Sequence, residues 1–239
     1  VSIRIEITKR KQMEEALKEL PQRIIQAQEA EQKRISREIH DDLGQSLVTS
    51  KILMQSLAEE INLRNSDLKE KCEKLINYQD TIIEKAQDIA SSLRPIVLQE
   101  YGLTAAIKIM IDEFKYKKGL KIEPQFCQMD NLKFQGEPIN IYRIIQESLT
   151  NIIKHAKATK VDVTFKKNES SLSIIIKDNG RGFSVNKTEK PRQSAGLGLS
   201  TMEERTRLLG GDIRINTSVD KGTEVFLSIP YHEGDENHV

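Results

Sequence analysis

The sequence of 239 residues contains 37 basic and 36 acidic side chains, which leaves a formal net charge of +1. Such a balance excludes the strongly basic surface by which many proteins bind nucleic acid. Charged residues make up 31% of the chain and aromatic residues only 5%, a composition that favours long helices and coiled-coil surfaces over a β-sandwich.

Cysteine usage, apolar runs and the first residue indicate the setting of the chain. Cys72 and Cys127 lie in different segments without metal-ligand spacing, which indicates reduced thiols in a cytosolic protein. No apolar run approaches the roughly eighteen residues that a membrane helix requires. The first residue is Val1 and not Met, so we expect the chain to be part of a longer protein.

The first third of the sequence is predominantly helical. Residues 1 to 11 alternate isoleucine with polar residues, which predicts the end of a strand. From Gln12 to about Leu63 apolar residues recur every three or four positions, which predicts a helix with coiled-coil character. Pro21 interrupts the pattern, and we expect a kink or a fresh helix start there.

A second long helix follows the first. Polar residues from Asn62 to Asp67 predict a turn, and Leu68 to Leu93 predict an amphipathic helix. Two such helices joined by a short turn form an antiparallel hairpin. Because one hairpin cannot cover both of its apolar faces, we expect two chains to form a dimeric four-helix bundle.

The rest of the sequence mixes helices and strands in a way that predicts an α/β sandwich. After a linker from Pro95 to Gly102, we expect helices at 103–117, 138–155 and 196–209 and strands at 120–127, 161–166, 172–177, 212–217 and 223–229. Residues 184–195 lack periodicity and predict a mobile loop, and the residues after Pro230 predict a frayed tail.

One histidine in the first helical stretch has the surroundings of a reactive side chain. His40 lies one step off the apolar stripe of a helix, with Asp41 beside it and Gln45 one turn beyond Asp41. An imidazole next to a carboxylate is a plausible nucleophile with its orienting base. A lone histidine on a polar helix is usually only a solvated side chain, so this motif depends on the rest of the chain.

The helix expected at 138–155 carries a line of polar groups. Glu147 and Asn151 are four residues apart and therefore share a face, with Lys154 and His155 a turn further on. A carboxylate and a carboxamide suit a hard cation such as Mg²⁺, and the two basic residues would then meet phosphate oxygens. The alternative is an ordinary solvated helix face.

Two glycine motifs follow. Asp178 ends an isoleucine-rich strand, where its carboxylate can accept a hydrogen bond from an exocyclic amine, and Gly180 and Gly182 permit close approach of the backbone to a ligand. Gly196 and Gly198 open a helix whose free N–H groups can hold phosphates. Each motif taken alone is often no more than a tight turn or a flexible joint.

In combination, E-x-x-x-N-x-x-K-H, D-x-G-x-G and G-x-G in this order resemble the ATP-binding domain of the GHKL group, which includes gyrase and the histidine kinases. Thr223 sits where the family places a threonine near the adenine, whereas Ile152 departs from the usual alanine and is expected to affect packing only. The resemblance implies ATP bound by Asn151, Lys154, His155, Asp178, Gly180, Gly182, Gly196, Leu197, Gly198 and Thr223, and Mg²⁺ bound by Glu147 and Asn151.

The upstream motif E-x-x-R-I-x-R-E-x-H-D-x-L-G-Q resembles the dimerisation and phosphoacceptor domain of two-component sensor histidine kinases. Its H-D-x-x-x-Q form is similar to the nitrate-sensor-like branch, whose partners are response regulators of the NarL type. The resemblance implies autophosphorylation of His40, transfer to an aspartate of the regulator, and regulator dephosphorylation assisted by Gln45. The implied catalytic residues are His40, Asp41, Gln45 and Glu147.

We therefore expect three regions and a homodimer. Residues 1–11 resemble the end of a PAS sensor domain, residues 12–95 form the signalling helix and phosphoacceptor domain, and residues 96–239 form the ATP-binding domain. The resemblance implies a cytoplasmic location for this part of the protein and leaves membrane anchoring, and phosphorylation within or across the dimer, open. The alternatives are a GHKL ATPase in which Glu147 activates water, and a helical relay without catalysis.

Overall fold

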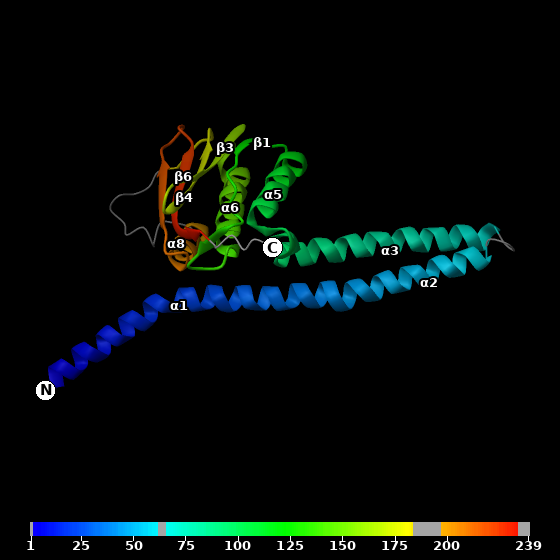
Figure 1. Ribbon diagram of the computed structural model, residues 1–239, viewed down its shortest axis with the longest axis horizontal. Coiled ribbons are helices and arrows are strands. Elements are labelled where there is room, and N and C mark those ends of the chain that lie inside the picture. The colour runs from blue at the N-terminus through cyan, green and yellow to red at the C-terminus, as the bar shows by residue number, and fades with distance from the viewer. Residues whose placement is uncertain (1, 62–65, 184–196, 234–239) are drawn as a thin grey trace. The chain divides into compact units, whose positions relative to one another are not determined.

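The computed structural model describes residues 2–61, 66–183 and 197–233 (Figure 1). The chain divides into two compact units, one comprising Arg23–Ile96 and the other comprising Val97–Val239 together with Val1–Gln22. The first unit is helical, and the second contains the sheet. No helix among the described residues is both long enough and apolar enough to cross a membrane.

The first helix, α1, runs without interruption over Ser2–Glu38, so the strand expected at residues 1–11 is wrong. A strand needs a neighbour for its backbone hydrogen bonds, and no described strand pairs with this segment, whereas a helix satisfies the same groups locally. The fresh start expected at Pro21 is also wrong, because the proline lies inside α1. It removes one backbone hydrogen bond there, and a bend at this residue stays a prediction.

The helical unit is the antiparallel hairpin that the sequence predicted. A π-helical turn, η1 (Ile39–Gly44), connects α1 to α2 (Gln45–Ile61), and α3 (Ser66–Leu93) returns alongside them. The expected turn at residues 62–67 falls mostly outside the described residues, and Ser66 and Asp67 already belong to α3. Ser36 Oγ donates to the carbonyl oxygen of Ala90 at 3.0 Å, which fixes α1 against α3.

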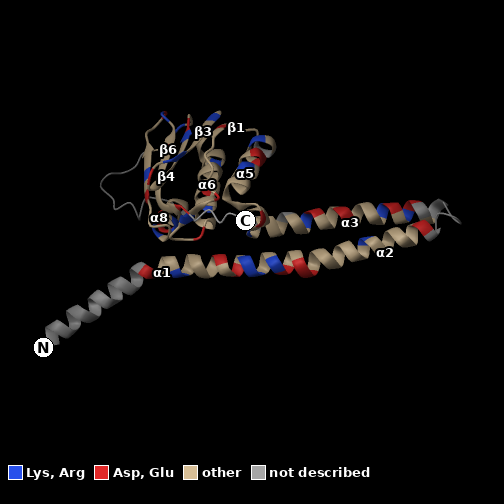
Figure 2. Cartoon of the chain, viewed as in Figure 1, with Lys and Arg blue, Asp and Glu red and all other residues tan. Residues whose placement is uncertain are grey.

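The hairpin leaves much of its apolar surface uncovered within one chain. Acidic and basic side chains are interspersed along the helices, with no large field of one sign (Figure 2). Between them lie exposed apolar side chains on η1, α2 and α3: Leu43, Val48, Ile52, Leu53, Leu57, Leu75 and Ile89. This surface is what the expected dimeric bundle would cover.

The second unit is a six-stranded mixed sheet with helices packed on it. The linker expected between Pro95 and Gly102 contains a short helix, α4 (Ile96–Glu100), which the sequence did not predict. The remaining helical elements are α5 (Gly102–Lys118), α6 (Ile139–Asn151), η2 (Ile152–Ala156) and α8 (Leu197–Leu208). The strands are β1 (Lys121–Gln125), β2 (Leu132–Phe134), β3 (Lys160–Lys167), β4 (Ser171–Asp178), β5 (Asp212–Thr217) and β6 (Thr223–Glu233).

The strand order is β1-β3-β4-β6-β2, and β5 also pairs with β6. The pairing of β1 with β3 is parallel and the other pairings are antiparallel. Along β3, β4 and β6 every second side chain is buried under α5 and α6, and these residues form one core: Val161, Val163, Phe165, Leu172, Ile174, Ile176, Val225, Leu227 and Ile229. The expected α/β sandwich is therefore confirmed.

The sheet differs from the expectation at its C-terminal end. Strand β6 continues past Pro230 to Glu233 and pairs with β2, which the sequence did not predict, so the frayed tail expected directly after Pro230 is wrong. Tyr231 is buried and its hydroxyl donates to the carbonyl oxygen of Asn168, which holds this extension in place. The mobile loop expected at residues 184–195 lies outside the described residues.

Candidate functional site

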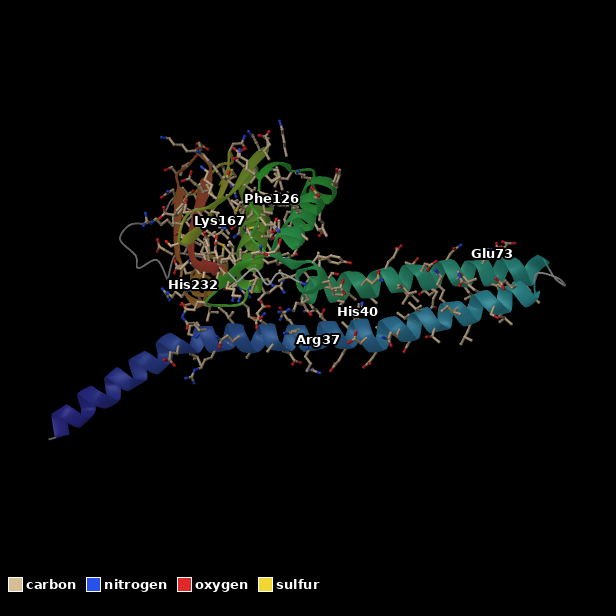
Figure 3. The ribbon with its side chains drawn as sticks, in the orientation of Figure 1. Arg37, His40, Glu73, Phe126, Lys167 and His232 are labelled. Carbon is tan, nitrogen blue, oxygen red and sulfur yellow. The ribbon has the colours of Figure 1, made fainter. Side chains whose placement is uncertain are left out.

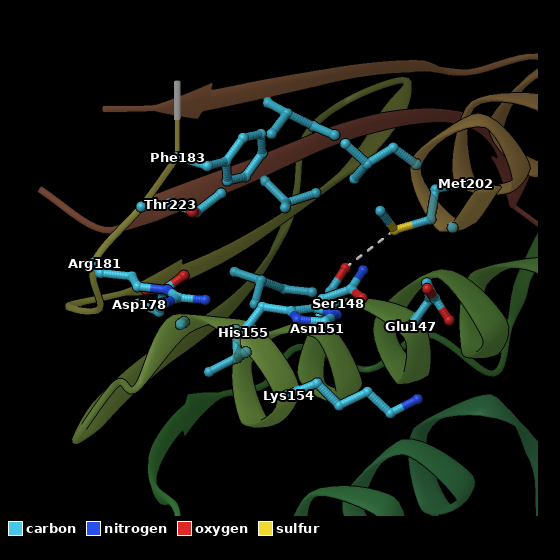
Figure 4. Close-up of a pocket in the computed structure, with 18 residues that line it drawn as sticks. Glu147, Ser148, Asn151, Lys154, His155, Asp178, Arg181, Phe183, Met202 and Thr223 are labelled. Carbon is cyan, nitrogen blue, oxygen red and sulfur yellow. Dashed lines mark hydrogen bonds between the residues drawn. The ribbon is translucent and has the colours of Figure 1, made fainter. Parts of the chain in front are cut away.

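A cavity of about 540 Å³ opens in the second unit between α6, η2, the start of α8 and the strands β4, β5 and β6 (Figure 4). Most of the side chains that the sequence singled out for ATP line it: Glu147, Asn151, Lys154, His155, Asp178, Gly182, Gly198 and Thr223. Gly180 is buried next to Asp178, Leu197 is the first residue of α8, and Gly196 lies outside the described residues.

Helix α6 carries the carboxylate and the carboxamide of the site. Its isoleucine-rich face is buried, and Glu147 and Asn151, four residues apart, are half-buried and line the cavity. A Cβ atom on Gly198 would collide with Oε1 of Glu147, so a larger residue here would displace the Glu147 carboxylate. Two oxygen-bearing side chains beside a helix N-terminus fit Mg²⁺, which keeps several waters and takes its other ligands from phosphates. Among the residues that the structure describes, no cluster of three or more His, Cys, Asp or Glu side chains could hold a metal.

Asp178 is the buried acid of the cavity. It ends β4 with 4% of its surface exposed, and its Oδ1 accepts a hydrogen bond from the backbone N–H of Gly180 at 2.7 Å. Burial raises the pKa of Asp178, and the backbone N–H groups of Gly180 and Thr223 partly oppose that rise. A buried acceptor among apolar walls can recognise a ligand that brings its own N–H donors.

The basic end of the site follows Asn151. The π-helical turn η2 carries Lys154 and His155, and both side chains are exposed and line the cavity. The turn ends at Lys157, which has a left-handed backbone with φ of 53°. Together with the free N–H groups at the start of α8, these two residues form a setting for anionic groups.

Several lining residues were not predicted from the sequence. Ser148 Oγ donates to Sδ of Met202 at 3.4 Å, which links α6 to α8 beneath the cavity (Figure 4). Phe183 directly follows the D-x-G-x-G motif and lines the cavity, as does Arg181. Ile152 also lines it, so this departure from the family pattern reaches the site and not only the packing. The position of Phe183 directly after the motif was the feature of the sequence that could have predicted its place in the cavity lining.

His40 belongs to the helical unit and lies in η1, where α1 passes into α2 (Figure 3). Its Nδ1 is 3.0 Å from Oδ1 of Asp41, and 52% of its side chain is exposed. Because a carboxylate can only accept, Nδ1 carries the proton in the neutral ring and Nε2 keeps a free lone pair. His40 and Asp41 thus form the pair that the sequence suggested.

The π-helical turn changes the relation between His40 and Gln45. A π-helix brings residues five apart into register, and His40 and Gln45 line the same cavity of about 410 Å³ beside α3. Asp41, expected to share a face with Gln45, is not among the residues lining that cavity. Gln45 therefore shares this cavity with His40.

Two family models match regions of this chain. A family model described as histidine kinase matches residues 31–98, and one described as histidine kinase-, DNA gyrase B-, and HSP90-like ATPase matches residues 136–233. The oxygen sensor histidine kinase NreB of Staphylococcus carnosus is 29% identical over 214 residues, which is 89% of this chain and 60% of that relative. The chain thus spans less than two thirds of the length of this curated relative.

Solved structures give weaker likenesses. The histidine kinase domain of a blue-light activated kinase from Erythrobacter litoralis has a TM-score of 0.48 and 18% identity over 74% of this chain and 94% of that one. The histidine kinase AdeS of Acinetobacter baumannii has a TM-score of 0.46 and 13% identity over 78% of this chain and 98% of that one. At these values the assignment rests on the family models and the site.

The sheet, the cavity and the motifs around it define an ATP-binding domain of the GHKL class, and a histidine-kinase region precedes it. The chain belongs to the histidine kinases, and the two matched regions correspond to a histidine-kinase domain and its ATP-binding domain. This confirms the family that the sequence motifs predicted.

Proposed function

We propose that this chain transfers the γ-phosphoryl group of ATP to His40 and from there to an aspartate of a response regulator. The observation that carries the proposal is the convergence of Glu147, Asn151, Asp178 and Gly198 on one cavity, in a chain whose other unit presents an imidazole with a free Nε2. A helical relay without catalysis has no use for such a cavity.

In this proposal the adenine lies against the apolar part of the cavity wall, which includes Ile176, Met202 and Val225. The carboxylate of Asp178 accepts a hydrogen bond from the exocyclic amine, and Thr223 lies beside it. The phosphates extend toward Lys154, His155 and the start of α8, where Leu197 and Gly198 supply backbone N–H groups.

Glu147 and Asn151 would hold Mg²⁺. When bound, the metal ion would neutralise part of the charge of the phosphates. Glu147 also lies where it could polarise a water molecule, which is the activity expected of a GHKL ATPase. Glu147 and Asn151 therefore permit both ATP hydrolysis and phosphoryl transfer to a side chain. Which reaction occurs depends on whether water or a side chain accepts the phosphoryl group.

His40 supplies that acceptor. Asp41 holds the Nδ1 proton, so the Nε2 lone pair attacks the γ-phosphorus while the bond between that phosphorus and the bridging β,γ-oxygen breaks and ADP leaves. Positive charge develops on the ring as the N–P bond forms, and the carboxylate of Asp41 stabilises it or accepts the proton. An imidazole titrates near neutral pH, which suits later release of the phosphoryl group to an aspartate.

The proposed function also implies the partners of this chain. We assign the uncovered apolar surface of the hairpin to a second copy of the chain, which gives a dimeric four-helix bundle. The regulator carries a receiver domain, and the H-D-x-x-x-Q motif supports one of the NarL type. We place catalysis in the cytoplasm, where ATP is available.

Incubation with ATP labelled in the γ-phosphate and Mg²⁺ tests this function. A histidine kinase retains label on the protein in a form that is stable to base and labile to acid, since a phosphoramidate bond hydrolyses in acid. A GHKL ATPase releases labelled phosphate and retains none. Release without retention, at any enzyme concentration, would contradict the proposed function.

A further inference from the structure

Asn179 lies inside the D-x-G-x-G motif at a position to which the motif assigns no role. It follows Asp178, where β4 leaves its pairing with β3. Its side chain is directed away from the cavity lining and onto the neighbouring strand, and it makes three hydrogen bonds there. This is an unusual density of side-chain bonds for an exposed residue.

The three bonds tie the turn to the start of β3. Oδ1 of Asn179 accepts from the backbone N–H of Thr159 at 2.9 Å and from that of Lys160 at 3.0 Å. Nδ2 of Asn179 donates to Oγ1 of Thr159 at 2.9 Å. The carboxamide therefore accepts from two backbone donors through Oδ1 and donates through Nδ2 at the same time, which an alkyl side chain of similar size cannot do.

The other flank of Gly180 is tied to the same segment. The backbone N–H of Arg181 donates to the carbonyl oxygen of Ala156 at 2.8 Å. Gly180 itself lies so close to Ala156 that a Cβ atom there would collide with it. Hydrogen bonds to segment 156–160 therefore hold the turn on both sides of this glycine. This segment begins at the last residue of η2.

The position of Gly180 in turn restrains the side chain of Asp178. The backbone N–H of Gly180 donates to Oδ1 of Asp178, so the position of Gly180 fixes the orientation of the buried carboxylate. The same segment ends the helix that carries Asn151 and His155. Hydrogen bonds from Asn179 and Arg181 therefore fix the position of Asp178 relative to Asn151 and His155.

We infer that Asn179 is a positioning residue that sets base selectivity through Asp178. This inference rests on the proposed binding of ATP. A fixed carboxylate pairs with the exocyclic amine of adenine and repels the carbonyl oxygen that guanine carries at the equivalent ring position. A carboxylate on a loosened turn rotates or takes up water, and the preference for adenine over guanine falls.

The test measures the dissociation constants of ATP and GTP by calorimetric titration of the whole chain with Mg²⁺ present. For Asn179→Ala we expect ATP to bind about tenfold more weakly, since three hydrogen bonds of ordinary strength are lost to water. The ratio of the GTP to the ATP constant should fall by a similar factor. Thr159→Val removes only the third bond, and ATP affinity should stay within about twofold of the wild-type value.

Asn168→Ala is the matched control. Asn168 is also exposed and lies at the other end of the β3–β4 hairpin, where its Nδ2 donates to Oγ of Ser173 at 2.9 Å. We expect this variant to lower the unfolding temperature without changing either nucleotide constant. Unchanged ATP affinity and unchanged selectivity in Asn179→Ala would overturn the inference, whereas a wild-type chain that binds no ATP would overturn the proposed function instead.

Discussion

Asp178 combines burial with a charge that no ion pair compensates among the described residues. Its raised pKa means that the folded chain holds a proton there more tightly than the unfolded chain, whose value is near 3.8. The stability contributed by that proton is fully present below 3.8 and is lost as the pH rises through the folded-state pKa. At neutral pH the folded protein therefore carries a destabilising carboxylate at the position where the base is recognised.

Asp178→Asn should separate these two effects. The amide oxygen can still accept from Gly180, but the buried charge is gone, so the unfolding free energy relative to wild type should increase between about pH 4 and pH 7. ATP affinity should fall in the same variant, because the amide can present its NH₂ group to the exocyclic amine. Urea unfolding across this pH range, with ATP titration at neutral pH, measures both. A stability difference independent of pH would mean that burial does not perturb this group.

Gln45 gives a second prediction at this scale. Its carboxamide shares a cavity with His40, and it can hold a water by donating and accepting hydrogen bonds without repelling a phosphoaspartate. In Gln45→Ala, dephosphorylation of purified phosphorylated regulator should fall about tenfold or more, while autophosphorylation persists. Gln87→Ala, which removes the other carboxamide of the same cavity, is the control. Equal loss of both activities in Gln45→Ala would leave this residue a merely structural role.

The polar site residues could be predicted because their chemistry depends on spacing along the chain. Glu147 and Asn151 share a helix face, and Asp178 with its glycines ends a strand, so one sequence suffices to propose their partners. Met202 and Ser148 could not be predicted, because an apolar or small residue facing a cavity has the same pattern as one facing the core. Asn179 was also missed, since the two residues to which it bonds, Thr159 and Lys160, lie about twenty positions earlier in the chain.

Among the elements, the long periodic ones were predictable and the short ones were not. Strand β2 has three residues, too few to show alternation, and it forms through pairing with the end of β6. Residues 2–11 alternate like a strand and still form helix, since a strand requires a partner that periodicity cannot supply. The π-helical turns η1 and η2 were missed for a related reason, because one extra residue in a turn leaves the apolar pattern almost unchanged.

The contact between α8 and α6 yields a prediction at the scale of elements. Gly198→Ala places a methyl group against the carboxylate of Glu147, so either the side chain moves or the start of α8 withdraws. Either shift displaces a group of the proposed site, so ATP affinity in the presence of Mg²⁺ should fall about tenfold, with little loss of stability because Oε1 is the end of a flexible side chain. Glu203→Ala, on the same helix outside the cavity lining, should bind as wild type. Undiminished affinity in Gly198→Ala would remove α8 from the phosphate site.

At the scale of the whole molecule, the sequence predicted a helical hairpin and an α/β sandwich because each has its own periodicity. It could not predict that β6 would pair with β4, β5 and β2, since pairing partners depend on contacts between distant segments. The sequence also predicted a dimer, because one hairpin cannot cover both of its apolar faces. Ile52, with 58% of its surface exposed on α2, is part of the apolar surface that a second copy would cover.

Ile52→Lys should therefore separate the dimer. A lysine ammonium buried in the bundle without a partner is strongly unfavourable, so sedimentation velocity should show a monomer at micromolar concentration. Gln55→Lys adds the same charge at an exposed polar position of α2 and should leave the dimer intact. A dimer that persists in Ile52→Lys would place the interface elsewhere.

The site of phosphorylation tests the central claim most directly. After reaction with labelled ATP and Mg²⁺, peptide mapping under alkaline conditions should locate one phosphoryl group on His40, with His155 unmodified. His40→Ala should carry no label while its ATP affinity and its sedimentation as a dimer match those of wild type. Label on His155, or label that persists in His40→Ala, would contradict the assignment of His40 as the acceptor.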